Sequence, residues 1–592
     1  MTPPAGTAAN PSHALALVIV DELARCGVTD AVLAPGSRSA ALAMALHDEP
    51  RIRLHVEIDE RSASFLAIGL ARATGRPAPV VVTSGSAVAN LHPAVVEADT
   101  GRVPLVLLTA DRPPELRQTG ANQAIDQLGI FGRSPRWSVE VGVPEDRPGV
   151  VGFWRATVSR AVAESLGLSG PAGPVHLNLP FREPTVPLTD DGRSPPAAPF
   201  TARLDGRPGR RPWTTVDRAP RHIPPAELEP FAGRMVATER GLIVVGQTTA
   251  RPGPIHDLAR AAGWPVIAEP TSGARTTPDT ISTAHHLLAH AGFARRHTPD
   301  LVVRIGRIGL SRNVAGLLRP EVPQVLLDPD GAWDDPERAI SDLLVADVAL
   351  TCATLRAQLA MPATSEWLDG WHEADARARQ VIDARLDADD VPSEPRTARD
   401  VGACLPAGST LVVASSMPVR DLDQFLAPRT GLRVVANRGA SGIDGFVSTA
   451  IGVALASDGP TVALAGDLSV LHDSSGFLVS PDVERVDLTF VVVDNGGGGI
   501  FSFLPQARFP GSFERVFGTP HGRDLADLAR LHHLGYSKVS SAGELVGAVE
   551  AAITAGGIQL VHVRTDRDAN VALHRRLTAA VGDALDELGL PG

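Results

Sequence analysis

Short apolar runs alternate with helical segments along most of this 592-residue chain, and this alternation limits the folds that the chain can adopt. A strand, a helix and a further strand in succession are typical of a βαβ unit, in which neighbouring strands run parallel. The predicted strands are residues 31–34, 52–56, 80–83, 104–109, 241–246, 265–269, 301–306, 324–328, 410–414, 433–436, 461–465, 488–493 and 559–563. We therefore predict an α/β fold built from three doubly wound parallel sheets.

The chain is too long for one hydrophobic core, so the strands must be shared among several domains. Residues 189–225 are rich in Pro, Arg, Gly and Asp and lack a hydrophobic period, which is typical of a surface linker. A second, shorter linker is predicted at 387–395. Near the start of the chain we expect a helix with Ser12 as N-cap and Gly27 as its stop. The predicted domains are 1–188, 226–385 and 386–592.

Charge and cysteine content exclude several classes of protein. The net charge of -12 and the sequence pI near 5.8 argue against a nucleic-acid or anionic-membrane partner. The three cysteines, Cys26, Cys352 and Cys404, are far apart in sequence, so we expect neither a disulfide framework nor a zinc site. The longest apolar runs are too short to span a membrane, and the first residues lack the pattern of a signal peptide. A cytoplasmic protein is the expectation.

Polar clusters follow two of the predicted strands in the third domain. Gly466-Asp467 ends one strand, and Asp494-Asn495-Gly496-Gly497 ends the next. Ligands of open α/β sheets bind at this edge, and carboxylate, amide and carbonyl oxygens suit Mg²⁺ bound together with phosphates. An Asp after a strand is also a common turn former or N-cap. The pairing with Asn495 favours a metal diphosphate site, and the glycines do not match a Rossmann motif or a P-loop.

Glu60 and four arginines are further candidates. Glu60 opens a predicted helix, where an acidic residue is also favoured simply by the helix dipole. The arginines each follow a predicted strand, and guanidinium groups recognise carboxylates with two parallel hydrogen bonds. Any single arginine is more readily explained as a solvated or salt-bridged surface residue, whereas the group together indicates substrates with several carboxylates. The four are Arg38, Arg112, Arg420 and Arg438.

Six segments resemble a known enzyme family over essentially the whole chain. They are residues 34–39 (APGSRS), 59–61 (DER), 83–91 (TSGSAVANL), 109–116 (TADRPPEL), 120–123 (GANQ) and 437–445 (NRGASGIDG). These strings resemble the 2-succinyl-5-enolpyruvyl-6-hydroxy-3-cyclohexene-1-carboxylate (SEPHCHC) synthases of menaquinone biosynthesis, which are thiamine diphosphate (ThDP) enzymes. The resemblance implies a pyrimidine-binding first domain, a central domain without cofactor, and a diphosphate-binding third domain.

The resemblance also implies roles for individual residues. Glu60 would hydrogen-bond N1' of the aminopyrimidine, and Asp467, Asn495 and the Gly497 carbonyl would bind Mg²⁺, with Mn²⁺ as a substitute. Ile443 would support the V shape of ThDP. The cofactor site would comprise Glu60, Ser416, Met417, Ser441, Gly442, Ile443, Asp467, Leu468, Ser469, Asn495 and Gly497. The substrate site would comprise Ser37, Arg38, Arg112, Asn122, Gln123, Arg312, Arg420, Arg438, Ile500 and Phe501. The catalytic residues would be Glu60, Arg38, Gln123, Arg420 and Arg438.

Three positions depart from the family pattern. Leu468 follows Asp467 where the superfamily has Gly, which leaves the metal ligand intact. Ser311 stands where some members carry Lys, so one positive charge toward the second substrate is missing. Gly499 stands where others carry Gln, which changes part of the expected pocket.

The implied reaction is ThDP-dependent decarboxylation of 2-oxoglutarate, followed by 1,4-addition of the succinyl-semialdehyde carbanion equivalent to isochorismate. No Ser or Cys nucleophile is then needed, because the cofactor supplies the carbanion chemistry. The implied assembly is a homodimer or a dimer of dimers, with each site shared by two chains. Two alternatives stay open at this stage. One is another ThDP carboligase such as an acetolactate synthase, and the other is a ThDP-fold subunit without catalytic activity.

Overall fold

The computed structural model describes residues 8–187, 200–359, 365–479 and 485–589. The chain divides into two compact units. The first unit comprises residues 1–218, 437–457 and 469–486, and the second comprises residues 219–436, 458–468 and 487–592. Three predicted positions lie outside the described residues. They are the end of the first domain at 188, the first part of the linker at 189–199, and Met361, near which we expect the strands of the central domain to end. The domain bounds themselves stay a prediction.

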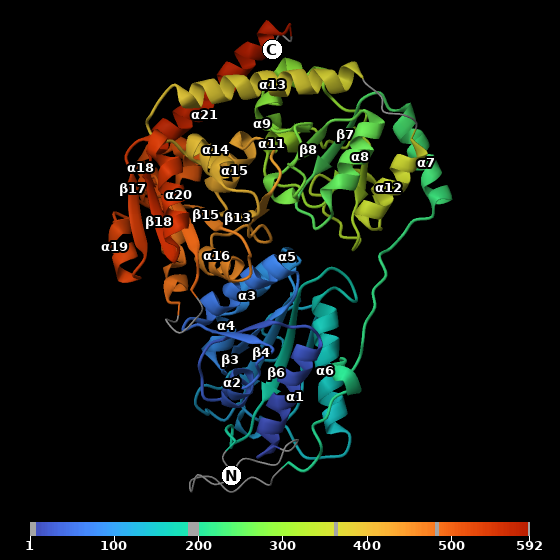
Figure 1. Ribbon diagram of the computed structural model, residues 1–592, viewed down its shortest axis with the longest axis vertical. Coiled ribbons are helices and arrows are strands. Elements are labelled where there is room, and N and C mark those ends of the chain that lie inside the picture. The colour runs from blue at the N-terminus through green and yellow to red at the C-terminus, as the bar shows by residue number, and fades with distance from the viewer. Residues whose placement is uncertain (1–7, 188–199, 360–364, 480–484, 590–592) are drawn as a thin grey trace. The chain divides into compact units, whose positions relative to one another are not determined.

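The first unit contains one six-stranded parallel sheet. Its strands lie in the order β2 (Arg53–Val56), β1 (Asp30–Leu33), β3 (Ala78–Val82), β4 (Leu105–Asp111), β6 (Pro174–Pro180) and β5 (Trp137–Glu140). Figure 1 shows helices α1 (Pro11–Arg25) and α6 (Val150–Ser165) on one side of β4 and β6, with α3 (Glu60–Thr74) on the other. The remaining helices of this unit are α2 (Ala40–His47), α4 (Ser86–Ala89), α5 (His92–Thr100) and α16 (Phe446–Leu455).

The second unit contains two further six-stranded parallel sheets. One has the order β12 (Ile340–Leu344), β11 (Gln324–Leu327), β10 (Leu301–Ile305), β7 (Gly241–Val245), β8 (Val266–Ala268) and β9 (Thr280–Ile281). The other has the order β14 (Leu432–Val435), β13 (Ser409–Val413), β15 (Thr461–Gly466), β16 (Leu488–Asp494), β18 (Ile558–Arg564) and β17 (Gly535–Val539). All strand pairs in the described residues are parallel, so the prediction of three parallel α/β sheets is confirmed.

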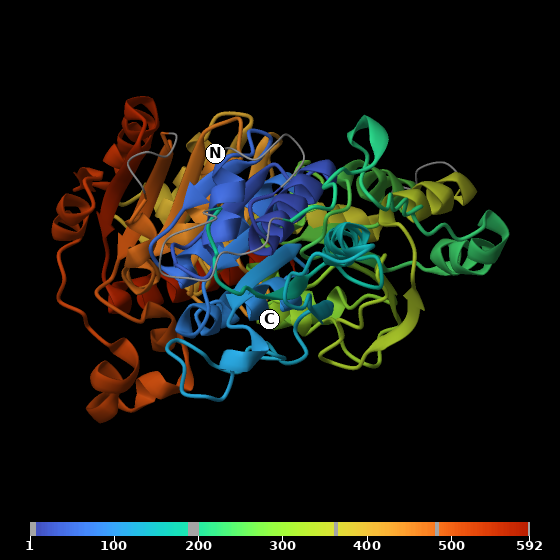
Figure 2. The same ribbon diagram turned by 90° about the horizontal axis from the view of Figure 1, so that it is seen from below.

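Helices cover the sheets of the second unit, and Figure 2 gives the same ribbon from below. They are α7 (Pro225–Ala237), α8 (Pro252–Ala262), α9 (Ala284–Leu287), α10 (Ala291–Arg296), α11 (Arg312–Ala315), α12 (Val348–Gln358), α13 (Glu366–Asp387), α14 (Glu394–Cys404), α15 (Met417–Phe425), α18 (Pro510–Phe513), α19 (Leu525–Leu531), α20 (Leu545–Ala555) and α21 (Arg567–Glu587). The short helix α17 (Asp467–His472) runs across the division between the two units.

The first and third sheets share one topology, although the sequence shows no repeat. Numbered from its own first strand, each has the order 2-1-3-4-6-5, whereas the second sheet has the order 6-5-4-1-2-3. The strand order reverses direction between β1 and β3 in the first sheet and between β13 and β15 in the third. In such sheets the carboxyl ends of the strands at the reversal are the usual place for a ligand. The topology therefore indicates that the residues after these four strands are candidates for a ligand site.

Every predicted strand is present, with ends that differ by one or two residues, but five further strands were not predicted. These are β5, β6, β9, β12 and β17. Strand β6 is fully buried, yet it begins and ends with proline and contains His176 and Asn178, so its sequence lacks an apolar run. Strands β5, β12 and β17 are partly exposed edge strands with polar residues, and such strands have a weak hydrophobic signal.

The start of helix α1 differs from the prediction. The N-cap is Asn10, whose Oδ1 accepts a hydrogen bond from the backbone N–H of His13 at 2.9 Å. Ser12 lies inside the helix, and its hydroxyl donates to the Arg182 carbonyl at 2.9 Å. The helix ends at Arg25, just before Gly27. Asn and Ser are both good N-caps, so the local sequence did not distinguish them.

Part of the predicted linker packs against the first unit. Phe200 is buried beside Trp154 of α6, with ring centroids 5.7 Å apart. Arg155 of α6 donates to the Leu204 carbonyl at 2.6 Å, and the Trp213 backbone N–H donates to Glu22 of α1 at 2.5 Å. Residues 200–218 therefore belong to the first unit and are held by buried contacts.

Helices α3 and α16 cross closely in the first unit, because glycines face each other at the contact. A Cβ on Gly69 of α3 would overlap the Thr449 carbonyl, and a Cβ on Gly452 of α16 would overlap the Leu66 carbonyl. This crossing places the amino end of α3 beside the 3₁₀ turn η4 (Ser474–Phe477), where Ser475 donates to Asp59 at 2.7 Å.

In the described residues, no helix is both long enough and apolar enough to cross a membrane.

Candidate active site

The carboxyl edge of the third sheet gathers the predicted metal-binding residues. Asp467 directly follows β15, and Asn495 and Gly497 follow β16. The two strands are neighbours in register, with Gly466 opposite Val493, so their ends meet at one edge. This arrangement places the three predicted ligands within one cluster of the second unit.

Asp467 is held by hydrogen bonds from three directions. Its Oδ1 accepts from the Leu468 backbone N–H at 2.7 Å, and its Oδ2 accepts from the Gly497 N–H at 2.8 Å. His521 Nε2 lies 3.1 Å from the same Oδ2. Burial, followed by the nearby carboxylate of Asp494, raises the pKa of Asp467 to about 6. A cation would relieve this cost of burial by favouring the ionised carboxylate.

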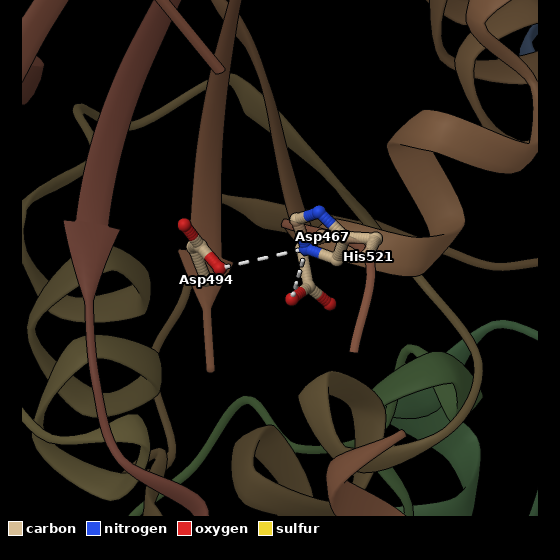
Figure 3. Close-up of side chains that lie close together, drawn as sticks. All are labelled: Asp467, Asp494 and His521. Atoms are coloured by element: carbon tan, nitrogen blue, oxygen red, sulfur yellow. Dashed lines mark hydrogen bonds and ion pairs between the residues drawn. The ribbon is translucent and has the colours of Figure 1, made fainter. Parts of the chain in front are cut away.

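Asp467, Asp494 and His521 form a cluster with metal-ligating atom types. One ligand atom from each lies within 4.8 Å of the others, and Figure 3 shows one ring nitrogen of His521 linked to both carboxylates. Asp494 is already engaged, because it accepts from His562 at 3.0 Å, Arg564 at 2.6 Å and the Gly496 N–H at 3.0 Å. The side chains of His562 and Arg564 lower the pKa of Asp494, against the effect of its burial. His562 and Arg564 thus balance the negative charge of Asp494, whereas the charge of Asp467 is not balanced in this way.

Asn495 provides the second oxygen that fits a metal. Its Oδ1 is buried and has no hydrogen-bond partner among the described residues, while its Nδ2 donates to Glu394 at 2.8 Å. A buried acceptor without a partner is unfavourable unless a ligand satisfies it. Together with the carboxylate of Asp467 it forms the hard oxygen set expected for Mg²⁺ bound with phosphates. The residues present therefore fit the metal that the sequence analysis predicted.

The backbone after β16 permits close approach of a ligand. Gly497 has φ of 149°, and a Cβ there would overlap the Gly518 carbonyl, so only glycine fits. Its carbonyl accepts from the Gly499 N–H at 2.9 Å and retains one further lone pair. Ile500 and Phe501 follow in the half-buried 3₁₀ turn η5 (Gly499–Phe503). The glycine run thus allows the backbone conformation and the close approach that a phosphate or metal site needs.

Two further predicted residues lie after β13, beside the point where the strand order reverses. Ser416 has φ of 74°, a strained conformation for a residue with a side chain, and Met417 begins α15. Arg420 donates to the Ser416 carbonyl at 2.6 Å. Burial, followed by the positive charge of Arg312, lowers the pKa of Arg420. Arg312 is exposed at the start of α11, so the two predicted substrate arginines of this unit are electrostatic neighbours.

In the first unit, Glu60 is the first residue of α3. The helix is capped by Asp59, whose Oδ1 accepts from the Arg61 N–H at 2.9 Å. Glu60 itself is half-buried, and Asn90 Nδ2 lies 3.4 Å from its Oε2. Capping by Asp59 leaves the Glu60 carboxylate unused by the helix end. It is therefore available to a ligand, although its contact with ThDP stays a prediction.

Arg38 and Arg112 are buried neighbours at the carboxyl ends of β1 and β4. Arg38 donates to the Phe181 carbonyl at 3.1 Å and pairs with Glu183 at 3.0 Å, and Arg112 Nε donates to the Asn122 carbonyl at 3.1 Å. Burial and the Arg112 cation lower the pKa of Arg38, which Glu183 partly offsets. Within the described parts of the chain, Arg38 Nε and Arg112 Nη1 are buried without hydrogen-bond partners. These donors fit a carboxylate.

A partly buried hydrogen-bond network supports the segment that carries Asn122 and Gln123. Gln123, with φ of 57°, donates to the Ser84 carbonyl at 3.0 Å, and Ser84 Oγ donates back to the Gln123 carbonyl at 2.9 Å. Gln127, which was not predicted, accepts from the Gly85 N–H at 3.1 Å and donates to Asn178 at 2.9 Å. Gln123 is itself exposed, as are Asn122 and Ser37. The network links the carboxyl ends of β3, β4 and β6.

The predicted segment from Arg438 to Ile443 belongs to the first unit. Glu97 of α5 accepts from the backbone N–H groups of Gly439 at 2.9 Å and Ala440 at 2.7 Å. It also accepts from Arg72 at 2.8 Å. Ser441 and Gly442 are exposed, Ile443 is half-buried, and Ser469 is buried in the same unit. Glu97 thus fixes the entry of this loop, and no local signal in the sequence indicated that role.

Glu57 is a buried acid that the sequence analysis missed. It is 3% exposed at the end of β2, and in the described structure its Oε2 has no hydrogen-bond partner. Burial, followed by Asp59 and Asp473, raises the pKa of Glu57 to about 8. His521 and Glu394 were also missed, because each reaches the metal-binding cluster from a distant part of the sequence.

The predicted residues are divided between the two units. The first unit holds Ser37, Arg38, Glu60, Arg112, Asn122, Gln123, Arg438, Ser441, Gly442, Ile443 and Ser469. The second unit holds Arg312, Ser416, Met417, Arg420, Asp467, Leu468, Asn495, Gly497, Ile500 and Phe501.

Two domain families match the two ends of the chain. The family described as thiamine pyrophosphate enzyme, N-terminal TPP binding domain, matches residues 13–130. The family described as thiamine pyrophosphate enzyme, C-terminal TPP binding domain, matches residues 417–563. The first match contains Glu60 and the second contains Asp467, Asn495 and Gly497. Fold and site together define a thiamine diphosphate-dependent enzyme.

Full-length relatives give the particular family. The SEPHCHC synthase of Thermobifida fusca (strain YX) is 50% identical over 580 residues, which are 97% of this chain and 100% of that protein. Those of Saccharopolyspora erythraea and Geobacillus kaustophilus are 45% and 41% identical, over 97% and 95% of this chain and 100% and 96% of theirs. The chain belongs to the SEPHCHC synthase family, which confirms the resemblance seen in the sequence.

Proposed function

We propose that this enzyme decarboxylates 2-oxoglutarate and adds the succinyl-semialdehyde carbanion equivalent to isochorismate in a 1,4-addition. The products are SEPHCHC and CO₂, in menaquinone biosynthesis. The observation that carries this proposal is the pair of buried guanidinium donors without partners in the described residues, Arg38 Nε and Arg112 Nη1. Both substrates carry carboxylates, and a carboxylate would satisfy these two buried donors, each of which lies near a second guanidinium group.

The cofactor site is proposed to use both groups of residues. Asp467, the Asn495 oxygen and the Gly497 carbonyl would hold Mg²⁺, with Mn²⁺ as a substitute, and the metal would hold the diphosphate. Bound ThDP supplies the nucleophile and electron sink of the reaction. Glu60 would accept and return a proton at N1' of the aminopyrimidine, and Ile443 would support the cofactor from below. Ser416, Met417, Ser441, Gly442, Leu468 and Ser469 would line it.

The substrate site is proposed to use the cationic and amide side chains. Arg38 and Arg112 would bind a carboxylate, and Gln123 would orient the reacting oxygen from the segment held by Gln127. Arg420, Arg438 and Arg312 would bind the remaining carboxylates. Ser37 and Asn122 would donate or accept hydrogen bonds, and Ile500 and Phe501 would exclude water. Guanidinium groups suit these roles because they bind carboxylates through paired, charge-assisted hydrogen bonds.

Pyruvate is the test substrate for the acetolactate-type alternative. Purified protein would be incubated with ThDP, Mg²⁺, isochorismate and either 2-oxoglutarate or pyruvate, and the product would be identified by mass spectrometry. We expect SEPHCHC from 2-oxoglutarate and little product from pyruvate, because pyruvate lacks the second carboxylate. Equal use of pyruvate would support the acetolactate-type alternative. Absence of any turnover, with ThDP bound as judged by circular dichroism, would support a subunit without activity.

The assembly and location are proposed on the same basis. We infer a homodimer or a dimer of dimers. In this assembly each site would combine the predicted residues of the first unit from one chain with those of the second unit from another chain. Closed two-fold assemblies of this kind are the commonest among soluble oligomers. We infer a cytoplasmic location from the three unpaired cysteines and the acidic net charge. Sedimentation and cell fractionation test these two inferences.

A further inference from the structure

The amide of Asn495 has two ends with opposite hydrogen-bonding character. Nδ2 donates to Glu394 Oε1 at 2.8 Å, and Oδ1 is the buried atom that lacks a partner among the described residues. A rotation of the amide by 180° would exchange these ends and present N–H groups where the oxygen now lies. Because N–H groups repel a cation, the orientation of this amide decides whether Asn495 can bind a metal.

Glu394 is placed to set that orientation. It lies in the first turn of α14 and is 4% exposed. The hydroxyl of Thr565 also approaches its Oε1, at 3.4 Å. In either protonation state a carboxyl group keeps an oxygen that accepts a hydrogen bond, so this oxygen favours the N–H end of the amide. Glu394 is not itself among the predicted metal ligands.

Gly499 leaves room for the amide on another side. A Cβ at this position would overlap Nδ2 of Asn495. The absence of a side chain here leaves room for the amide, while the hydrogen bond to Glu394 alone distinguishes its nitrogen from its oxygen.

We propose that Glu394 is a positioning residue, which holds the Asn495 amide so that its oxygen faces the bound metal. The inference rests on the proposed function, in which Asp467 and Asn495 bind the metal of the cofactor. Groups that orient metal ligands through hydrogen bonds typically contribute 10- to 100-fold to metal affinity. Glu394 acts through Asn495 and does not touch the substrate.

The test measures Mn²⁺ binding to the full-length protein with ThDP and without substrates, by electron paramagnetic resonance. We expect Glu394→Ala to weaken Mn²⁺ binding roughly 10- to 100-fold. Glu394→Gln keeps a carbonyl oxygen at the same reach and should recover much of the affinity. The matched control is Glu366→Ala, which removes an exposed acid from the first turn of α13 and should bind like the wild type. Unchanged affinity in Glu394→Ala would overturn the inference.

A second background separates positioning from a structural effect. With Asn495→Asp both ends of the side chain are oxygens, so no orientation remains to be fixed. In that background Glu394→Ala should leave Mn²⁺ affinity unchanged or increase it, because a neighbouring acid is removed. An equal loss in both backgrounds would show that Glu394 acts only on structure and would overturn the proposal.

Two further outcomes are defined in advance. If Glu394→Ala does not fold, Glu394→Asp replaces it, because the shorter side chain keeps the carboxyl group but cannot keep the 2.8 Å hydrogen bond. We expect about a tenfold loss for this variant, and wild-type affinity would overturn the inference. If the wild type binds no Mn²⁺ in the presence of ThDP, the proposed function itself is wrong and this inference falls with it.

Discussion

Several buried polar atoms have no hydrogen-bond partner in the part of the chain that the structure describes. Four of them are Asn495 Oδ1, Arg38 Nε, Arg112 Nη1 and Glu57 Oε2. Each such atom costs about 1–3 kcal/mol when nothing binds it. Three of the four belong to residues or clusters predicted to hold ligands. At the scale of single residues, these three predicted residues therefore keep hydrogen-bonding capacity that a ligand can use.

Glu60 provides the most direct test at this scale. We expect Glu60→Gln to lower kcat by roughly 10²- to 10⁴-fold, because an amide cannot exchange a proton with N1'. Metal and ThDP binding should survive in part. The control is Glu227→Gln, which removes an exposed acid from the first turn of α7. A Glu60→Gln enzyme with the wild-type rate at saturating ThDP would mean that Glu60 only stabilises its helix.

Arg112 tests the recognition of carboxylates. Arg112→Ala should cost roughly 2–5 kcal/mol in kcat/KM for 2-oxoglutarate or isochorismate, since one partner of a buried charge pair is lost. ThDP affinity should change little. Arg160→Ala serves as control, because Arg160 is a largely exposed residue of α6 paired with Glu164. Steady-state kinetics and ThDP titration make the comparison, and equal losses in both would indicate a structural role for Arg112.

Glu57 predicts a pH dependence of stability. The folded protein keeps the proton of Glu57 up to a pKa of about 8, whereas the ordinary value is 4.5. The folded state therefore binds more protons between these values, and this contribution to stability is complete below about pH 4.5 and falls as pH rises through about 8. Glu57→Gln should be more stable than the wild type at pH 8.5, by on the order of 1–3 kcal/mol, and the difference should vanish near pH 4.5. Thermal unfolding at several pH values measures it, and a pH-independent difference contradicts it.

At the scale of elements, the crossing of α3 and α16 determines where the first unit presents Glu60. The crossing depends on Gly69 and Gly452, because a side chain at either would meet backbone of the other helix. The carboxyl ends of the parallel strands then place the remaining polar residues at the sheet edges. Helix packing and sheet topology thus act together on the same few residues.

Gly69→Ala tests this crossing. The added methyl group should force the helices apart and destabilise the protein by about 1–3 kcal/mol. Gly547→Ala in α20 is the matched control, because a Cβ there meets nothing within 4 Å. That variant should be stabilised by about 0.5–1 kcal/mol, as expected for Gly to Ala in a helix. Thermal unfolding compares the two, and stabilisation of Gly69→Ala would contradict the close crossing.

At the scale of the whole molecule, the residues of the proposed site are divided between the two compact units. Glu60 and the Arg38–Arg112 pair lie in the first unit, and Asp467 and Asn495 lie in the second. The first family match, residues 13–130, lies wholly in the first unit, whereas the second, residues 417–563, includes segments of both units. An assembly in which two chains complete each site is consistent with this division and can be tested by mixing variants.

Glu60→Gln and Asp467→Asn chains should complement each other. In a mixed dimer one site would collect both changes and the other would collect neither, so the second site should be active. Random exchange makes about half of the dimers mixed, each with one working site of two, so recovery should approach about a quarter of wild-type activity. Co-expression with two affinity tags measures it. Activity no higher than that of the separate variants, in purified mixed dimers, would place both residues in one chain's site.

The three parallel sheets could be predicted from the sequence, as could the positions of most candidate residues. The alternation of apolar runs and helical segments is a local property, and the buried parallel strand β16 can be recognised from its continuous apolar run. Asp467 and Asn495 could be identified because each directly follows such a run. Polar edge strands such as β17, and the proline-bounded β6, could not be predicted because their stability comes from neighbours distant in sequence.

The sequence by itself determined the fold class, the family and the residues that follow each strand. Hydrophobic periodicity and strand-end motifs depend only on residues that are close together in the sequence. The tertiary structure alone decided which distant groups act on those residues. His521 reaches Asp467 across 54 positions, and Glu394 reaches Asn495 across 101. Glu97 holds the loop at Gly439 across 342 positions. Such contacts depend on the packing of whole elements, and no short stretch of sequence specifies them.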